Sequence, residues 1–196
     1  HAYLLTGPNS VGKFTVAKNL AGILQCEGNF CHSCSVCMQV EKGCHIDTVE
    51  MLDNGESIKI DEMRKLIERL NMTRQSKYKV VLIQSIERMG NEAANSFLKM
   101  LEEPPERTIF IMTTDKVQAL LQTIISRVRV VKFASVSQGY IKNSLKNLFP
   151  EMEDKTVEEV TSFSMGKTGK AMQLAQEPEV LASYIKTYHE IINFLD

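Results

Sequence analysis

A glycine-bounded loop between a short apolar strand and a helix constrains this chain more than any other feature of its sequence. The apolar run Tyr3–Thr6 predicts a buried strand, and helical spacing of apolar residues runs from Phe14 to Leu24. The residues between them follow the pattern Gly-x4-Gly-Lys, which is typical of a phosphate-binding loop when it joins a strand to a helix. We expect phosphate-loop ancestry; a plain glycine turn is the alternative.

The loop retains its phosphate-binding half and lacks its metal-binding half. Backbone N–H groups of such a loop surround phosphate oxygens, and the next residue after the lysine is Ser or Thr, because its hydroxyl binds Mg²⁺. Phe14 stands there, and a phenyl ring cannot ligate a hard cation. Thr15 comes one residue late, rotated by about 100° on a helix, so we expect no productive Mg-ATP binding. The candidate site begins with Gly7, Pro8, Asn9, Ser10, Val11, Gly12, Lys13, Phe14 and Thr15.

The position of the second metal ligand is also changed. A P-loop ATPase holds Mg²⁺ with an Asp at the end of a buried strand, often followed by a Glu that activates water. The apolar strand Val80–Ile83 ends instead in Gln84 and Ser85, neither of which is an anion. Glu87 is a second candidate for the acid, but we interpret it as a solvated charge where a helix begins. Two separate losses predict a pocket that keeps its shape without its chemistry.

Strands and helices alternate along the first two thirds of the chain. This alternation predicts a doubly wound α/β domain, with a parallel sheet and helices on both faces. Beyond the first strand and helix, strands are predicted at 48–51, 80–83, 109–112 and 128–133, and helices at 60–70 and 91–101.

The pattern changes after residue 134, where only helical spacing remains. We expect a P-loop NTPase-like α/β domain at 1–134, a small all-helical lid at 135–177, and the start of a further helical domain at 178–196. The chain opens on an apolar strand and ends within a helical pattern, so we expect it to be part of a longer protein.

Four cysteines lie within twelve residues in the pattern Cys-x4-Cys-x2-Cys-x2-Cys. A secreted protein could use them for disulfides, but no secretory signal is visible, and four thiolates at this spacing suit a tetrahedral structural zinc. His32 is an alternative ligand, and Cys44 is expected to be a lone thiol. We predict a zinc module at 26–44, ordered by its metal. The expected ligands are Cys26, Cys31, Cys34 and Cys37.

The net charge argues against an independent nucleic-acid binder, and hydropathy argues against a membrane-spanning protein. The net charge is -1, whereas a free-standing nucleic-acid binder is usually basic, and no apolar run reaches the roughly 18 residues of a membrane span. A local run of basic residues is interpreted as a solvated helix face, with contact to a DNA backbone inside a larger assembly as the alternative. The run comprises Arg64, Lys65, Arg69, Arg74, Lys77 and Lys79.

Several phrases resemble the clamp-loader branch of the bacterial AAA+ proteins. The most specific is Leu98-Lys99-Met100-Leu101-Glu102-Glu103-Pro104-Pro105. The opening strand, the cysteine cluster and three further segments match as well, and together they cover about two thirds of the chain. These further segments are Lys77–Val80, Ile111–Asp115 and Ser126–Val128.

The resemblance implies a choice between two types of subunit. Gamma/tau subunits are working ATPases, and delta-prime subunits have the same fold with a degraded site. Phe14, Gln84 and Ser85 favour the delta-prime type, and the resemblance adds Thr113 to the degraded site. The position of the family's sensor arginine is Gly169, with Lys170 beside it as a substitute.

The resemblance also gives a role to Arg127 in Ser126-Arg127-Val128. In this family the corresponding arginine is a finger that reaches the γ-phosphate in a neighbouring subunit, where negative charge develops in the transition state. A surface salt bridge is the alternative role for Arg127, and Arg129 is the alternative residue for the finger.

These observations predict a cytoplasmic bacterial clamp-loader subunit that does not hydrolyse ATP. The implied partners are gamma/tau ATPase subunits and a delta subunit in a hetero-pentamer, a sliding clamp, and primer-template DNA reached through the complex, with no membrane. One rival is a gamma/tau-type ATPase. The other is a stand-alone zinc-containing nucleic-acid-binding module.

Overall fold

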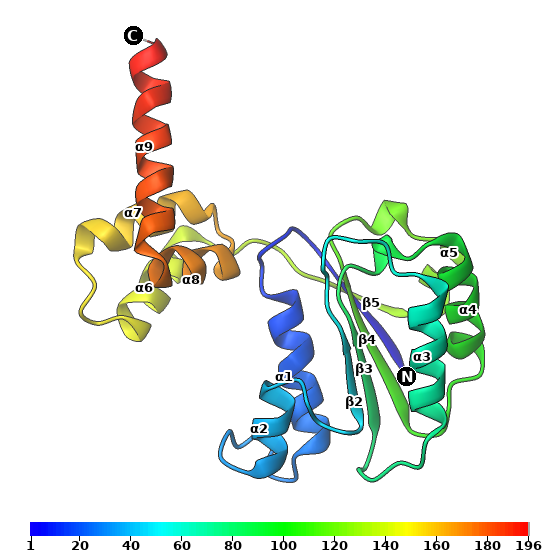
Figure 1. Cartoon of the computed structure of the whole chain (residues 1–196). Coiled ribbons are helices and arrows are strands. Elements are labelled where there is room, and N and C mark those ends of the chain that lie inside the picture. The colour runs from blue at the N-terminus through cyan, green and yellow to red at the C-terminus, as the bar shows by residue number, and fades with distance from the viewer. Residues whose placement is uncertain (196) are drawn as a thin grey trace. The chain divides into compact units, whose positions relative to one another are not determined.

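The computed structural model describes residues 1–195 and divides the chain into two compact units (Figure 1). The α/β unit contains His1–Gly7 and Lys13–Phe133. The helical unit contains the residues from Ala134 onward together with the five-residue segment Pro8–Gly12. The glycine-bounded loop is therefore shared between the two units.

The α/β unit is built on a parallel five-stranded sheet in the order β2-β3-β4-β1-β5. The three central strands are almost fully buried, as their continuous apolar sequences require in a sheet covered on both faces. The edge strand β5 is exposed along its length. The strands are β1 Ala2–Thr6, β2 Thr48–Met51, β3 Lys79–Ile83, β4 Thr108–Thr114 and β5 Arg129–Lys132.

Helices cover both faces of this sheet (Figure 1). Val80 and Leu82 of β3 point into the apolar layer beneath α1, while Val81 and Ile83 point into the layer on the other face, because side chains alternate along a strand. Helices α1 and α2 lie on the first face, and α3, α4 and α5 on the second. The helical segments are α1 Lys13–Gln25, α2 Ser35–Glu41, α3 Ile60–Asn71, η1 Ile86–Arg88, α4 Asn91–Glu102, η2 Val117–Ala119 and α5 Gln122–Ile125. The predicted fold class is confirmed.

The helical unit has an apolar core of its own. Ile141, Val157 and Leu174 are buried there, and the first turns of the last helix join it through Leu181. The helices are α6 Gln138–Leu148, α7 Asp154–Ser164, α8 Thr168–Gln176 and α9 Pro178–Leu195. The domain boundary expected at residue 178 stays a prediction. Within the described residues, none of the helices has both the length and the apolar character needed to cross a membrane.

Candidate functional site

The loop lysine is the first residue of α1, and its charge is neutralised within the α/β unit. Lys13 is 6% exposed; its Nζ donates to the carbonyl oxygen of Gly7 at 2.8 Å and lies 2.7 Å from Oδ1 of Asp115. Parallel pairing of β1 with β4 brings these groups together, because Thr6 lies opposite Thr114 and both strands end at one edge of the sheet. Sequence reasoning had assigned Asp115 no role.

The two residues after the lysine carry no hydroxyl in the place that a magnesium ligand requires. The ring of Phe14 is partly buried and packs against the apolar layer beneath α1, so it belongs to the core. Thr15 is exposed on the surface of α1. Phe14, which stands at the position of the magnesium ligand, therefore packs in the apolar core instead.

The residues at the carboxyl end of β3 are occupied by hydrogen bonds that brace neighbouring loops. The side-chain oxygen of Gln84 accepts the N–H of Asp53 at 3.2 Å. Ser85 has a positive φ of 53°, and its N–H donates to the hydroxyl of Thr113 at 3.3 Å. The structure thus brings Gln84, Ser85 and Thr113 together in an arrangement that braces neighbouring loops.

Two carboxylates lie beside these residues. Glu87 is not the solvated charge that was predicted: one oxygen accepts the N–H of Asp115 at 3.3 Å, and the other is buried without a hydrogen bond from the described residues. Asp53 pairs with Arg88 at 2.9 Å. The Ser85 hydroxyl, the N–H of Gly55 and the charge of Arg88 lower the pKa of the Asp53 carboxyl. Sequence reasoning misread Glu87 because its hydrogen-bond partner, Asp115, follows β4 and lies far from it in the sequence.

In the helical unit, the loop segment caps a helix. Ser10 has a φ of 61°, and its carbonyl oxygen accepts the N–H of Gly169 at 2.7 Å and that of Lys170 at 3.3 Å, at the start of α8. A Cβ at Gly169 would lie 2.8 Å from this oxygen, so only glycine allows the approach. The Lys170 ammonium lies 4.4 Å from the centre of the Tyr184 ring. The residue at the expected sensor position is therefore a glycine that contacts the loop through its backbone.

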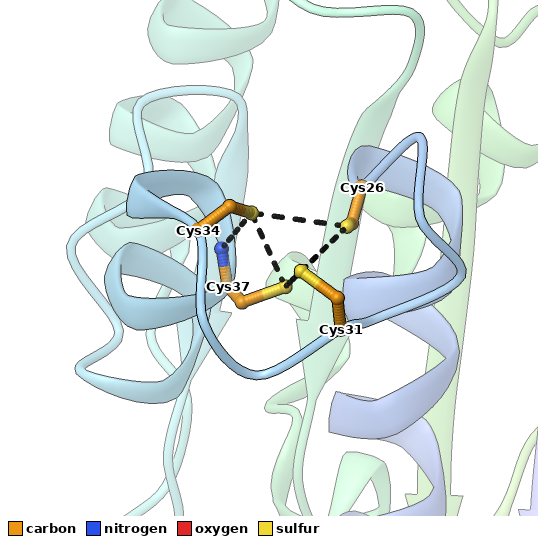
Figure 2. Close-up of side chains that lie close together, drawn as sticks. All are labelled: Cys26, Cys31, Cys34 and Cys37. Atoms are coloured by element: carbon orange, nitrogen blue, oxygen red, sulfur yellow. Dashed lines mark hydrogen bonds between the residues drawn. The ribbon is translucent and has the colours of Figure 1, made fainter.

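The four cysteines form one compact cluster at the end of α1 and the start of α2 (Figure 2). The sulfur of Cys26 lies 3.8 Å from that of Cys31 and 3.8 Å from that of Cys34. The sulfur of Cys37 lies 3.9 Å from that of Cys31 and 3.5 Å from that of Cys34. A tetrahedral ion with Zn–S bonds of about 2.3 Å requires sulfur separations of roughly 3.8 Å. The cluster therefore fits a four-sulfur structural zinc.

The surroundings of the cluster act on its thiols in different ways. The N–H of Gly28 donates to the sulfur of Cys26 at 3.3 Å, and the N–H of Cys37 donates to that of Cys34 at 3.4 Å, at the N-terminus of α2. The hydroxyl and N–H of Ser33 lower the pKa of the Cys31 thiol to about 5. Burial raises the pKa of Cys37 to about 12, so a metal must displace a proton there.

The two other candidates near the cluster lie outside it. His32 is exposed, and its Nδ1 lies 2.6 Å from a carboxylate oxygen of Glu41. Cys44 is an exposed free thiol. The set of four cysteine ligands is thus the one that the sequence predicts.

Arg127 lies just after α5 and forms an ion pair. One terminal nitrogen of its guanidinium donates to the carbonyl oxygen of Thr123 at 2.9 Å, and the other donates to Oε1 of Glu102 at 2.6 Å. Its side chain is 35% exposed. The surface salt bridge considered from the sequence is therefore present, and the finger role stays a prediction.

The basic run around α3 is not one continuous surface. Arg64 pairs with Asp61 at 2.8 Å. Lys79 is buried, and its ammonium donates to the carbonyl oxygens of Arg69, Leu70 and Met72 at the end of α3. Including Lys79 in a solvated or DNA-facing run was wrong, because β3 carries it beneath the helix, where it binds the unpaired carbonyl groups of the last turn.

Comparison with known proteins assigns the chain to a family. A protein family described as DNA polymerase III, delta subunit matches residues 1–137. The chain belongs to this family. Among its relatives, the DNA polymerase III subunit gamma of Buchnera aphidicola subsp. Schizaphis graminum is 31% identical over 185 residues, which cover 90% of this chain and 51% of the relative. The subunit delta' of Bacillus subtilis is 37% identical over 149 residues, which cover 74% of this chain and 45% of the relative.

The chain thus spans about half the length of these curated relatives, and both subunit types match it. A solved structure of the Thermotoga maritima RuvB Holliday junction branch migration motor superposes on 94% of this chain and 56% of its own, with a TM-score of 0.61 and 17% identity. This likeness concerns the fold alone. The parallel sheet followed by a helical unit is the AAA+ P-loop NTPase-like architecture.

Proposed function

We propose that this member of the family is a clamp-loader subunit of the delta-prime type, which keeps the ATPase fold and does not hydrolyse ATP. The observation that carries the proposal is the joint replacement of the metal-binding groups. Phe14 is part of the core, and Gln84 and Ser85 are uncharged residues that brace loops. Mg²⁺ needs hard oxygen ligands in nearly octahedral geometry, and these positions supply no carboxylate.

The engagement of the loop supports the same proposal. The ammonium of Lys13 already has a carboxylate partner in Asp115, and the carbonyl oxygen of Ser10 is bound to the start of α8. A nucleotide would have to compete with the first contact. The subunit would act in a hetero-pentamer with gamma/tau ATPase subunits and a delta subunit, and would help to load a sliding clamp on primer-template DNA.

Arg127 is the group that we propose to act in catalysis, in the site of a neighbouring ATPase subunit. It lies at an exposed helix end and keeps guanidinium donors that its three internal acceptors, in Thr123, Ser126 and Glu102, do not use. An arginine supplied in this way stabilises charge on the transferred phosphoryl group.

The gamma/tau-type ATPase is the second candidate. It is favoured by the gamma relative, which matches 90% of this chain, and by the intact Gly-x4-Gly-Lys loop. The two candidates differ in a direct measurement, the rate of Mg-ATP turnover by the isolated full-length protein. We expect no turnover above background, and steady turnover would favour the gamma/tau type.

The arginine finger is tested in the assembled complex. Arg127→Ala should leave the subunit folded and lower ATP hydrolysis at the one affected site by about 10³-fold. Arg129→Ala is the matched control, because Arg129 is an exposed arginine two residues later, and its loss should leave the rate unchanged. Full activity of the Arg127 variant would remove the finger role, and loss in the control alone would transfer it to Arg129.

A further inference from the structure

The guanidinium of Arg127 is held by the ends of two helices. Its two terminal nitrogens bind different groups, the carbonyl oxygen of Thr123 in α5 and the carboxylate of Glu102, the last residue of α4. The side chains of Arg127 and Glu102 are 35% and 50% exposed, so both are accessible to solvent. The guanidinium that we propose to act on a neighbour's phosphate is thus already paired with the Glu102 carboxylate of its own subunit.

We propose that Glu102 restrains Arg127 on its own subunit and competes with the neighbour's phosphate for the guanidinium. This inference rests on the proposed arginine-finger function. Glu102 would act through Arg127, so it is a positioning residue and not a catalytic one.

Competition follows from the chemistry of the three groups. Carboxylates and phosphates bind the same fork of N–H donors on a guanidinium. If Glu102 stayed bound during hydrolysis, its negative charge would offset the positive charge that stabilises the transition state. Arg127 must therefore leave Glu102 to act.

The restraint is weak enough to be reversed. Exposed ion pairs contribute little to stability, since water solvates the separated charges well. The neighbour's γ-phosphate, which is doubly charged and lies in a site shielded from water, can therefore displace Glu102 from the guanidinium. The carbonyl oxygen of Thr123 is uncharged and holds the arginine without opposing its charge.

The adjacent Glu103 provides a matched control. It belongs to the same pair of acidic residues, its backbone N–H binds the carbonyl oxygen of Lys99, and its exposed side chain has no ion pair among the described residues. A change that removes one negative charge at either position alters the net charge equally. Only the change at Glu102 removes the contact with Arg127.

The test uses the full-length subunit in the assembled clamp loader with its ATPase partners. Glu102→Gln should raise the kcat for ATP hydrolysis at the site facing Arg127 by about two- to fivefold, the scale of an exposed ion pair. Glu103→Gln should leave it unchanged. Combining Glu102→Gln with Arg127→Ala should give the rate of Arg127→Ala alone, because the restraint has no other target.

A second measurement examines the contact without ATP hydrolysis. In the isolated subunit, hydrogen exchange of the Arg127 guanidinium, followed by ¹⁵N NMR, should be faster in Glu102→Gln than in the wild type. Equal exchange would overturn the restraint.

The outcomes separate the two proposals. An unchanged or lower rate in Glu102→Gln, with Arg127→Ala still impaired, overturns the restraint and leaves the finger intact. Full activity of Arg127→Ala overturns the finger and the restraint that rests on it.

Discussion

Lys13 has the sequence context of a phosphate-binding lysine, yet its nearest anion belongs to the protein. Asp115 is 102 positions away in the chain, so no local pattern predicts the pair. The pairing of β1 with β4 creates it, and the carboxyl ends of these strands were the signal that could have found it. By contrast, the replacement of Ser or Thr by Phe14 and of an acid by Gln84 could be read from the sequence, because it depends only on which residue types stand at fixed positions in a motif.

The contact between Lys13 and Asp115 should be measurable as stability. Asp115→Ala leaves a buried ammonium without its carboxylate, which should lower the free energy of unfolding by about 1–3 kcal/mol. Adding Lys13→Met removes the buried positive charge as well and should restore part of the loss. Urea unfolding of the two variants and the wild type measures both effects; an Asp115→Ala protein as stable as the wild type would contradict this account.

His45 should make the stability of the fold depend on pH. It is 4% exposed; Nδ1 lies 3.1 Å from the hydroxyl of Thr48, and Nε2 lies 3.5 Å from that of Ser76. Burial lowers its pKa from the ordinary value of 6.5, with the charge of Asp47 acting in the opposite direction. Below pH 6.5 the unfolded chain therefore binds a proton that the folded chain does not, so the free energy of unfolding falls as pH decreases toward the folded pKa.

This dependence is tested by urea unfolding between about pH 7.5 and 5.5, around the ordinary histidine pKa. His45→Gln should lose stability less steeply than the wild type as the pH falls. His189→Gln is the control, since His189 is exposed on α9 and should leave the slope unchanged. Parallel curves for the wild type and His45→Gln would exclude His45 as the origin.

At the scale of elements, long apolar runs were predicted well. β2 has the predicted bounds, and β3 begins only one residue earlier than predicted. The agreement is close because a run of buried aliphatic residues has few other stable arrangements. The edge strand β5 is shorter at each end than predicted. The short helices α2 and α5 were missed, since seven and four residues are too few to show a helical period.

The cysteine module shows why its ligands were predictable and its helix was not. Its four cysteines are close in sequence, so spacing alone brings them together, whereas α2 begins just after Cys34, whose sulfur accepts the backbone N–H of Cys37. Two apolar side chains of the module, Phe30 and Val40, join the layer beneath the sheet. Metal binding should therefore stabilise a segment that contributes little apolar area of its own.

The metal content of the purified protein tests whether the cysteine module binds zinc. The purified protein should contain one zinc per chain, because the four sulfurs complete a tetrahedral shell. Cys37→Ser should lower the content well below one, while Cys44→Ser, outside the cluster, should retain it. Chelation should accelerate amide exchange at 26–44 and leave β3 and β4 protected, and a zinc-free protein with the same exchange would refute a structural role.

At the scale of the whole molecule, charge decides between an independent DNA-binding protein and a subunit that reaches DNA through partners. The chain has 23 basic and 24 acidic residues. Of the basic run around α3, Lys79 is buried and Arg64 is paired, which leaves four residues without such a partner among those described. The local sequence does not distinguish buried or paired basic residues from solvent-exposed ones, because a lysine beneath a helix and a lysine in solvent are the same residue type.

The isolated protein should therefore bind DNA weakly. At about 0.15 M salt we expect a dissociation constant above roughly 10⁻⁵ M for a primer-template duplex, within the range of nonspecific binding, because few cations contact phosphates together. Fluorescence anisotropy measures it, and lowering the salt should strengthen binding with a shallow slope. In the proposed complex several subunits would contact phosphates, so its binding should be tighter and its salt slope steeper. Tight binding by the isolated chain at physiological salt would instead favour the zinc-containing nucleic-acid-binding module.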